Sequence, residues 1–304
     1  MHRLTAALAG LTLAIVLAAC GSDDGDRPEP GSPESAPTIT IGTKNFTEQY
    51  ILGELYSQAL DAEGFDVDLK SDIGSSEIVD RALTAGSLDM YPEYTGVLLS
   101  EIAGVRKKPR SAREAYDAAK AFQETRGFTL LAMTPFSDSN ALATTPEFAR
   151  EHRLRTIDDL GGVSGGVTIA APPEFRTRFE GLVGLREVYG LDGVQVKPFK
   201  IGAQYGALDR GRVDAAAVFT TDGQLVEKRY TVLSDPRRLF AFQNVAPVIK
   251  ADLAERYPAL VETADAVSAK LTTEAMREMN LAVQRGDEPA VVAERFLREN
   301  SLAE

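Results

Sequence analysis

The clearest catalytic pattern in the sequence is GVSGG at residues 162–166, which satisfies the G-x-S-x-G motif of serine hydrolases. In that motif the serine stands on a strained turn that follows a strand and enters a helix. Here the motif follows a predicted helix at 156–160 and precedes a predicted strand at 167–171, which is the reverse order. The only histidine beyond residue 2 is His152, which lies among charged residues typical of a solvated face. The pattern therefore does not favour a Ser–His hydrolase.

Other residue types that could do chemistry have ordinary structural explanations. The acid pairs Asp89 with Glu93 and Asp158 with Asp159 have the composition of a glycosidase pair, but acids are common where they cap helices. Residues 74–76 (GSS) precede a predicted helix and could either bind an anion through free backbone amides or simply cap that helix. The sequence contains no phosphate-loop motif and no G-x-G-x-x-G fingerprint. These observations favour a protein that binds a molecule without transforming it.

Composition excludes several further classes. The chain has 304 residues, of which 44% are hydrophobic, and this is enough for a packed core. It carries 33 Lys and Arg against 45 Asp and Glu, a net charge of −12, which argues against general binding to nucleic acid or to anionic lipid. One cysteine and two histidines rule out a disulfide framework, a cysteine metal cluster and a His-rich metal site. We therefore expect no metal and no cofactor.

The N-terminus has the form of an export signal. A basic start at Arg3 is followed by an uncharged run from Leu4 to Ala19, shorter than the ~20 residues of a membrane-spanning helix. The sequence LAACG that ends this run resembles the bacterial lipobox, which implies lipidation of Cys20 after removal of a signal peptide at 1–19; an ordinary cleaved signal peptide is the alternative. Residues 20–37 then form a Pro-, Gly-, Ser- and acid-rich segment that predicts a disordered tether. We expect a lipid-anchored protein on the extracytoplasmic side of the cell membrane.

From Thr38 onward the pattern alternates between strands and helices. Alternating or β-branched apolar runs predict strands, and apolar residues at helical spacing predict helices. The predicted strands are 38–42, 65–69, 88–91, 128–133, 167–171, 194–199 and 213–219. The predicted helices are 47–60, one opening at 74–76, 96–103, 111–125, 146–153, 176–189 and 203–210, with a helical tail over 249–302. This order predicts an α/β protein with two parallel sheets, helices on both faces, and a ligand site at the carboxyl ends of the strands.

Five segments together resemble one family, the substrate-binding proteins of osmoprotectant ABC importers, which carry glycine betaine, choline or related quaternary ammonium compounds. The segments are GTKNFTEQYILG at 42–53, DMYPEYTG at 89–96, APPEFRTR at 171–178, IGAQYGAL at 201–208 and VFTTDGQ at 218–224. The resemblance implies a two-lobed periplasmic-binding-protein fold (type II), with lobes that close on the ligand. It places lobe one at 38–136 plus 244–304 and lobe two at 137–243, joined by crossover strands near 136–142 and 238–246.

The resemblance also implies a site with two halves. In this family an aromatic cage surrounds the ammonium head by cation–π attraction, and cationic side chains hold a ligand carboxylate. Tyr94 matches a cage residue, and Lys44 and Arg178 match the two carboxylate-binding positions. Asp138 falls where a backbone carbonyl lines the pocket.

Four positions depart from the family pattern. Asn140 and Gln243 stand where tyrosines are common, Phe219 replaces another tyrosine, and Val97 stands where a hydroxyl residue is usual. Phe219 would still pack on a ligand, whereas Asn140 and Gln243 would tune selectivity through hydrogen bonds. A hydroxylated or aromatic acid, such as a polyphenol, would therefore suit this pocket as well as a quaternary ammonium compound.

The resemblance implies a small-molecule ligand, an ABC permease with its ATPase, and attachment to the membrane through the lipid anchor. We expect a monomer without enzymatic activity that binds no nucleic acid. Two alternatives remain open: a secreted hydrolase on an α/β scaffold, and a sensor or adhesion domain that kept the fold and lost transport.

Overall fold

The computed structural model describes residues 37–227, 229–240 and 242–303. The predicted signal peptide at 1–19, the lipidated Cys20 and the tether up to residue 36 lie outside these residues. Within the described ranges, no helix is both long enough and apolar enough to span a bilayer.

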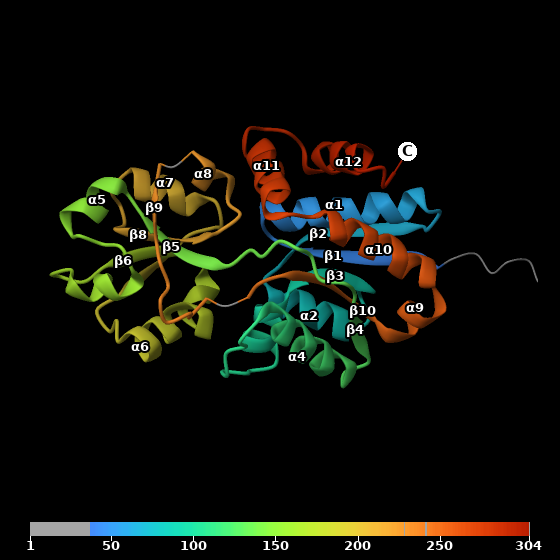
Figure 1. Ribbon diagram of the computed structural model, residues 1–304, viewed down its shortest axis with the longest axis horizontal. Coiled ribbons are helices and arrows are strands. Elements are labelled where there is room, and N and C mark those ends of the chain that lie inside the picture. The colour runs from blue at the N-terminus through green and yellow to red at the C-terminus, as the bar shows by residue number, and fades with distance from the viewer. Residues whose placement is uncertain (1–36, 228, 241, 304) are drawn as a thin grey trace, which may run out of the picture. The chain divides into compact units, whose positions relative to one another are not determined.

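The first sheet has five strands in the order β2-β1-β3-β10-β4 (Figure 1). Its strands are β1 (Ile39–Lys44), β2 (Val67–Gly74), β3 (Met90–Tyr94), β4 (Phe128–Leu130) and β10 (Val245–Lys250). β1 pairs in parallel with β2 and β3, whereas β10 runs antiparallel to β3 and β4. The sheet is therefore mixed, and the prediction of a wholly parallel sheet is wrong here, because a strand from the C-terminal part of the chain inserts between β3 and β4.

Helices cover both faces of this sheet (Figure 1). Their bounds are α1 (Thr47–Ala62), α2 (Ser76–Thr84), α3 (Thr95–Val97), η1 (Leu98–Ile102), α4 (Ala112–Glu124), α9 (Ala251–Arg256), α10 (Pro258–Lys270), α11 (Thr273–Gln284) and α12 (Pro289–Glu299). One apolar core joins α1 with the C-terminal helices α10 to α12. A second core packs α2, η1 and α4 against the opposite face. The predicted amphipathic helices thus bury their apolar faces against the sheet, as the 3.6-residue period requires.

The second sheet has the order β7-β6-β8-β5-β9. Its strands are β5 (Asn140–Thr144), β6 (Thr168–Ala171), β7 (Gln195–Pro198), β8 (Ala215–Phe219) and β9 (Thr231–Leu233). β6 is parallel to β7 and β8, and β5 is antiparallel to β8 and β9. This sheet is mixed in the same way, and β9 was not predicted from the sequence.

Short helices cover the second sheet. They are α5 (Pro146–Glu151), η2 (Ile157–Gly162), η3 (Pro173–Arg176), η4 (Phe179–Val183), α6 (Gly184–Tyr189), α7 (Ala203–Asp209) and α8 (Gly223–Val226). The prediction of one continuous helix over 176–189 is wrong, because the chain kinks at Glu180 and Gly181. A Cβ atom at Gly181 would lie 2.2 Å from the carbonyl oxygen of Phe175, so only glycine fits this close approach.

Two chain segments connect the sheets, near residues 131–139 and 234–244. They meet at an isolated antiparallel bridge between Ser137 and Asn244. Most of each connecting segment is irregular, because β5 begins only at Asn140 and β10 only at Val245. The strands expected near 136–142 and 238–246 therefore cover only the ends of those ranges. The lobe boundaries at 136/137 and 243/244 stay predictions.

The Asn244 side chain links the two connecting segments by hydrogen bonds, and its removal should lower the stability of the protein by a measurable amount. Asn244 is buried, and its Nδ2 donates to the carbonyl oxygens of Thr134 and Phe136, each at 3.0 Å. We expect Asn244→Ala to lower the free energy of unfolding by about 2 kcal/mol, because two buried acceptors lose their donor. Urea denaturation measures this, with Asn300→Ala, which loses one bond at a helix end, as the control. A loss no larger than that of the control would contradict the expectation.

Candidate ligand-binding site

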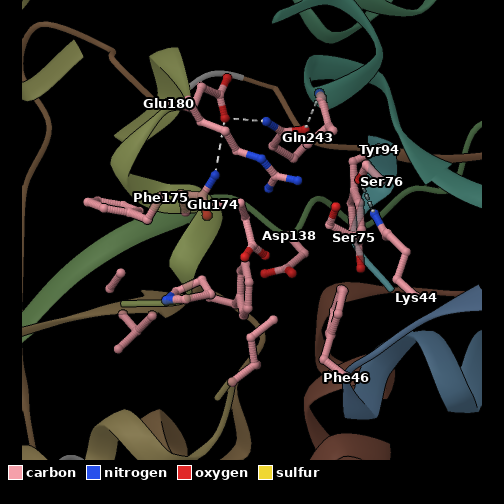
Figure 2. Close-up of a pocket in the computed structure, with 18 of the residues that line it drawn as sticks. Lys44, Phe46, Ser75, Ser76, Tyr94, Asp138, Glu174, Phe175, Glu180 and Gln243 are labelled. Carbon is pink, nitrogen blue, oxygen red and sulfur yellow. Dashed lines mark hydrogen bonds between the residues drawn. The ribbon is translucent and has the colours of Figure 1, made fainter. Parts of the chain in front are cut away.

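A pocket lined by residues of both sheets and of the connecting segments contains every residue that the resemblance assigns to ligand binding (Figure 2). Those residues are Lys44, Tyr94, Asp138, Asn140, Arg178, Phe219 and Gln243. The pocket encloses about 730 Å³ of space free of protein atoms, a figure that includes its opening to solvent. It lies where β1, β3, β6 and β8 end, as expected for ligand sites of open α/β sheets.

Lys44, the last residue of β1, is almost fully buried and already has protein partners. Its Nζ forms an ion pair with Glu93, donates to Ser76 Oγ at 3.2 Å, and lies 4.0 Å from the centre of the Tyr94 ring. Burial lowers the pKa of Lys44, and the charge of Glu93 opposes this effect. The positive charge of Lys44 is therefore balanced inside the protein.

Arg178 is paired in a similar way. Its Nε and Nη2 donate to the two carboxylate oxygens of Glu77, on α2, at 3.0 and 2.8 Å. Burial by itself would raise the pKa of Glu77, but the hydrogen bonds and charge of Arg178 lower this pKa to about 2. This bidentate pair connects a helix of the first sheet to the segment between η3 and η4 of the second.

Three aromatic rings line one side of the pocket. Phe46 stacks on Phe219 with ring centres 5.3 Å apart and planes at 16°, and it also lies 6.3 Å from Tyr94. The sequence analysis did not single out Phe46, although it stands two residues after Lys44 in a segment that carries the family resemblance. Its place directly after β1 was the available indication, because residues that follow a strand reach the ligand side of the sheet.

A group of three buried carboxylates lies next to these rings, and Thr221 joins two of them by hydrogen bonds. Glu48 accepts hydrogen bonds from the Thr221 hydroxyl, from Tyr94 OH and from Asn280 Nδ2. The backbone N–H of Thr221 donates to Asp138 Oδ1 at 3.2 Å, so the Asp138 side chain belongs to this group. That its backbone carbonyl contacts a ligand stays a prediction. The third carboxylate is that of Asp222.

The pKa values of all three carboxyl groups are raised. Burial and then the charges of Glu48 and Asp222 raise the pKa of Asp138 well above its usual range. Burial raises the pKa of Asp222 to about 6 and also raises the pKa of Glu48, in each case against the hydrogen bonds that the carboxylate accepts. These groups favour protonation inside the folded protein.

Asn140 donates to Glu180 Oε2 at 3.2 Å. Gln243 donates to the same oxygen at 2.6 Å (Figure 2). Gln243 Oε1 in turn accepts the backbone N–H of Val97 at 3.1 Å. The two amides predicted to select the ligand therefore hold a carboxylate of the protein. The sequence did not indicate Glu180 as a site residue, because it lies within a stretch that was predicted to be one continuous helix. In the structure the chain kinks at Gly181, and Glu180 lines the pocket.

The G-x-S-x-G motif at 162–166 lies outside this pocket. Ser164 is exposed, follows η2 and precedes β6, and His152 packs on the Phe148 ring; neither residue lines the pocket. Over the residues with described positions, no group of three or more His, Cys, Asp or Glu side chains has an arrangement that could hold a metal ion.

Two mixed α/β sheets, joined by two segments and sharing a pocket, define the class of substrate-binding proteins that serve importers. Residues 37–299 match the OpuAC family, described as the substrate-binding domain of ABC-type glycine betaine transport systems. The chain belongs to this family, whose members are extracytoplasmic binding components of ABC importers. The family is one of binding proteins and not of enzymes.

Relatives and solved structures agree with this assignment. The chain is similar to a "Glycine-betaine-binding protein" of Pseudomonas aeruginosa, with 32% identity over 88% of this chain and 89% of the relative. It is also similar to "Carnitine transport binding protein OpuCC" of Listeria monocytogenes, with 25% identity over 89% of each chain. Among solved structures, a "glycine betaine/carnitine/choline ABC transporter" has a TM-score of 0.69 and 26% identity, covering 87% of this chain and 99% of that one. The predicted two-lobed periplasmic-binding-protein fold is thereby confirmed.

Proposed function

We propose that this protein captures a small quaternary ammonium osmoprotectant, of the glycine betaine or choline type, and delivers it to the permease and ATPase of an ABC importer. The observation that carries the proposal is the pocket itself, which is lined by three neighbouring aromatic rings and by acidic side chains. Aromatic rings and carboxylates are the groups that attract an organic cation. The names of the relatives point to the same ligand class.

Four of the predicted site residues contact the ligand in this proposal. Tyr94 and Phe219, supported by Phe46, pack on the ligand. Lys44 and Arg178 contribute N–H donors where the ligand carries a carboxylate, in addition to their bonds to Glu93 and Glu77. The protein performs no covalent chemistry on its cargo.

Closure of the lobes and attachment to the membrane complete the proposed function. The lobes at 38–136 plus 244–304 and at 137–243 close on the ligand by a hinge at the two connecting segments. A lipid on Cys20 anchors the protein as a monomer to the extracytoplasmic side of the cell membrane, and residues 20–37 act as its tether.

Calorimetric titration of the full chain, kept in detergent, tests this function. The panel contains glycine betaine, choline, proline betaine and carnitine, together with a set of phenolic acids and polyphenols. We expect binding of at least one quaternary ammonium compound, and a ligand at 100-fold its Kd should add about 2.7 kcal/mol to the free energy of unfolding. No heat from the first group, together with binding of a hydroxylated aromatic acid, would contradict the proposal and favour the alternative ligand class.

A further inference from the structure

Gln204 is a buried glutamine of the pocket whose side-chain carbonyl oxygen has no hydrogen-bond donor. It lies in the first turn of α7, lines the pocket and is 1% exposed. Among the residues that the structure describes, none donates a hydrogen bond to Gln204 Oε1. A buried polar atom without a partner costs free energy, so nearly all such atoms in folded proteins have one. At the wall of a ligand pocket, the missing donor points to a group of the ligand.

Packing alone does not explain a glutamine at this position. Leu208, one turn further along α7 on the same face, belongs to the apolar core between this helix and the second sheet. Ile201, Ala217 and Val218 line the pocket together with Gln204. A leucine or methionine would fill such a place without the cost of burying an amide group. The amide of Gln204 is therefore expected to serve binding.

The other buried polar side chains of the pocket have partners within the protein. Ser76 and Asp138 accept hydrogen bonds, from Lys44 Nζ and from the backbone N–H of Thr221. Gln243 donates one hydrogen bond and accepts another. Lys44 and Tyr94 donate to carboxylates. Gln204 differs from all of these residues, because its acceptor is unused within the described part of the chain.

The chemistry of Gln204 Oε1 limits which part of a ligand can bind to it. A quaternary ammonium group has no N–H to donate, and a carboxylate only accepts hydrogen bonds. Neither end of a simple betaine therefore satisfies this oxygen. A hydroxyl group donates one hydrogen bond and is uncharged, so it matches a neutral acceptor in an apolar part of the wall. A ligand without such a group leaves the amide unpaired and loses affinity.

We infer that Gln204 is a specificity-determining residue of this pocket, and that its Oε1 accepts a hydrogen bond from a hydroxyl group of the ligand. Among quaternary ammonium compounds, the protein selects those that carry a hydroxyl group and discriminates against those without a donor, such as glycine betaine. This inference rests on the proposed function and narrows it.

The decisive probes are choline and ethyltrimethylammonium, titrated into the full chain in detergent. The two cations share the trimethylammonium head and a two-carbon chain, and they differ in one hydroxyl group. We expect the wild-type protein to bind choline at least about 10-fold more tightly, because the analogue leaves a buried acceptor unpaired. Gln204→Met, which has a side chain of similar size without an amide, should reduce this preference to less than about 3-fold.

A matched control is Gln123→Met. Gln123 is a buried glutamine of α4 that does not line the pocket, and its Oε1 accepts a hydrogen bond from Arg126 Nη1 at 3.2 Å. This variant should leave the ratio of the two affinities unchanged and lower the melting temperature by about 2 °C, because a hydrogen bond is lost. Gln204→Met should not lower the melting temperature by more than about 1 °C, since Gln204 Oε1 has no protein donor to lose.

Three results would overturn the inference. If the wild-type chain binds both cations equally well, or if Gln204→Met keeps the full preference for choline, the role of Gln204 is refuted and the proposed function stands. The same conclusion follows if the chain binds glycine betaine more tightly than choline, because glycine betaine has no hydroxyl group. If the chain binds no quaternary ammonium compound at all, the proposed function fails and this inference fails with it.

Discussion

Replacement of Glu48 by alanine is expected to lower the free energy of unfolding by about 4 kcal/mol, because three buried donors lose a shared acceptor and a void remains. Glu48 is 3% exposed and lies in the first turn of α1. Its carboxylate receives Tyr94 OH from β3, Asn280 Nδ2 from α11 and the hydroxyl of Thr221, which follows β8 of the second sheet. One side chain thus connects elements of both sheets, and its loss should weaken ligand binding as well as folding.

Denaturant unfolding of the purified protein measures the effect on stability. Glu54→Ala is the matched control, since Glu54 lies on the same helix and accepts one hydrogen bond, from Gln58. We expect the control to cost less than about 1 kcal/mol, as is usual for partly exposed pairs. Equal losses for the two variants would show that the three hydrogen bonds accepted by Glu48 add nothing to the stability of the folded protein.

The sequence pattern predicted the parts of the fold that depend on local periodicity. Amphipathic helices such as α1 and α4 and the parallel strands β1, β2 and β6 all lie close to their predicted places. The pattern did not indicate the direction of β10, since an apolar run is equally compatible with either pairing sense. β10 pairs with β3 across about 150 residues of chain, and such long-range pairing has no local signature.

For the site as well, residues with a local sequence signature were predicted, and residues that depend on the three-dimensional structure were not. Lys44 and Arg178 were found because they follow strands in segments with a strong family resemblance, and the structure brings both to one pocket. Glu180 was missed because its exposure to the pocket depends on a backbone kink, which requires the close approach of Gly181 to Phe175. Glu48 was missed because an acid in the first turn of a helix is readily explained by the helix dipole.

The stability of the ligand-free protein is expected to rise as the pH falls from 7 to 5. The pKa of Asp222 in the folded protein is about 6, and the pKa values of Asp138 and Glu48 are also raised, mainly by burial. A carboxyl group with a raised pKa binds more protons when folded than when unfolded, so folding is favoured as the pH falls through the folded pKa. The gain is complete once the pH is below the unfolded pKa. We expect Asp222 alone to contribute an increase of about 1 kcal/mol, and the shifts of Asp138 and Glu48 act in the same direction.

Denaturant titrations at several pH values measure this increase, and Asp222→Asn isolates the share of one group. The asparagine oxygen can still accept the hydrogen bonds that Tyr205 OH and the backbone N–H of Phe219 give to Asp222. The variant should therefore fold normally and show a pH dependence that is smaller by about 1 kcal/mol. Glu77, with its pKa lowered to about 2, acts in the opposite sense, but its contribution is lost only below its unfolded pKa of 4.5, so stability should be greatest near pH 5. A free energy of unfolding that falls between pH 7 and pH 5 would show that the three buried carboxyl groups are ionised at no cost to folding.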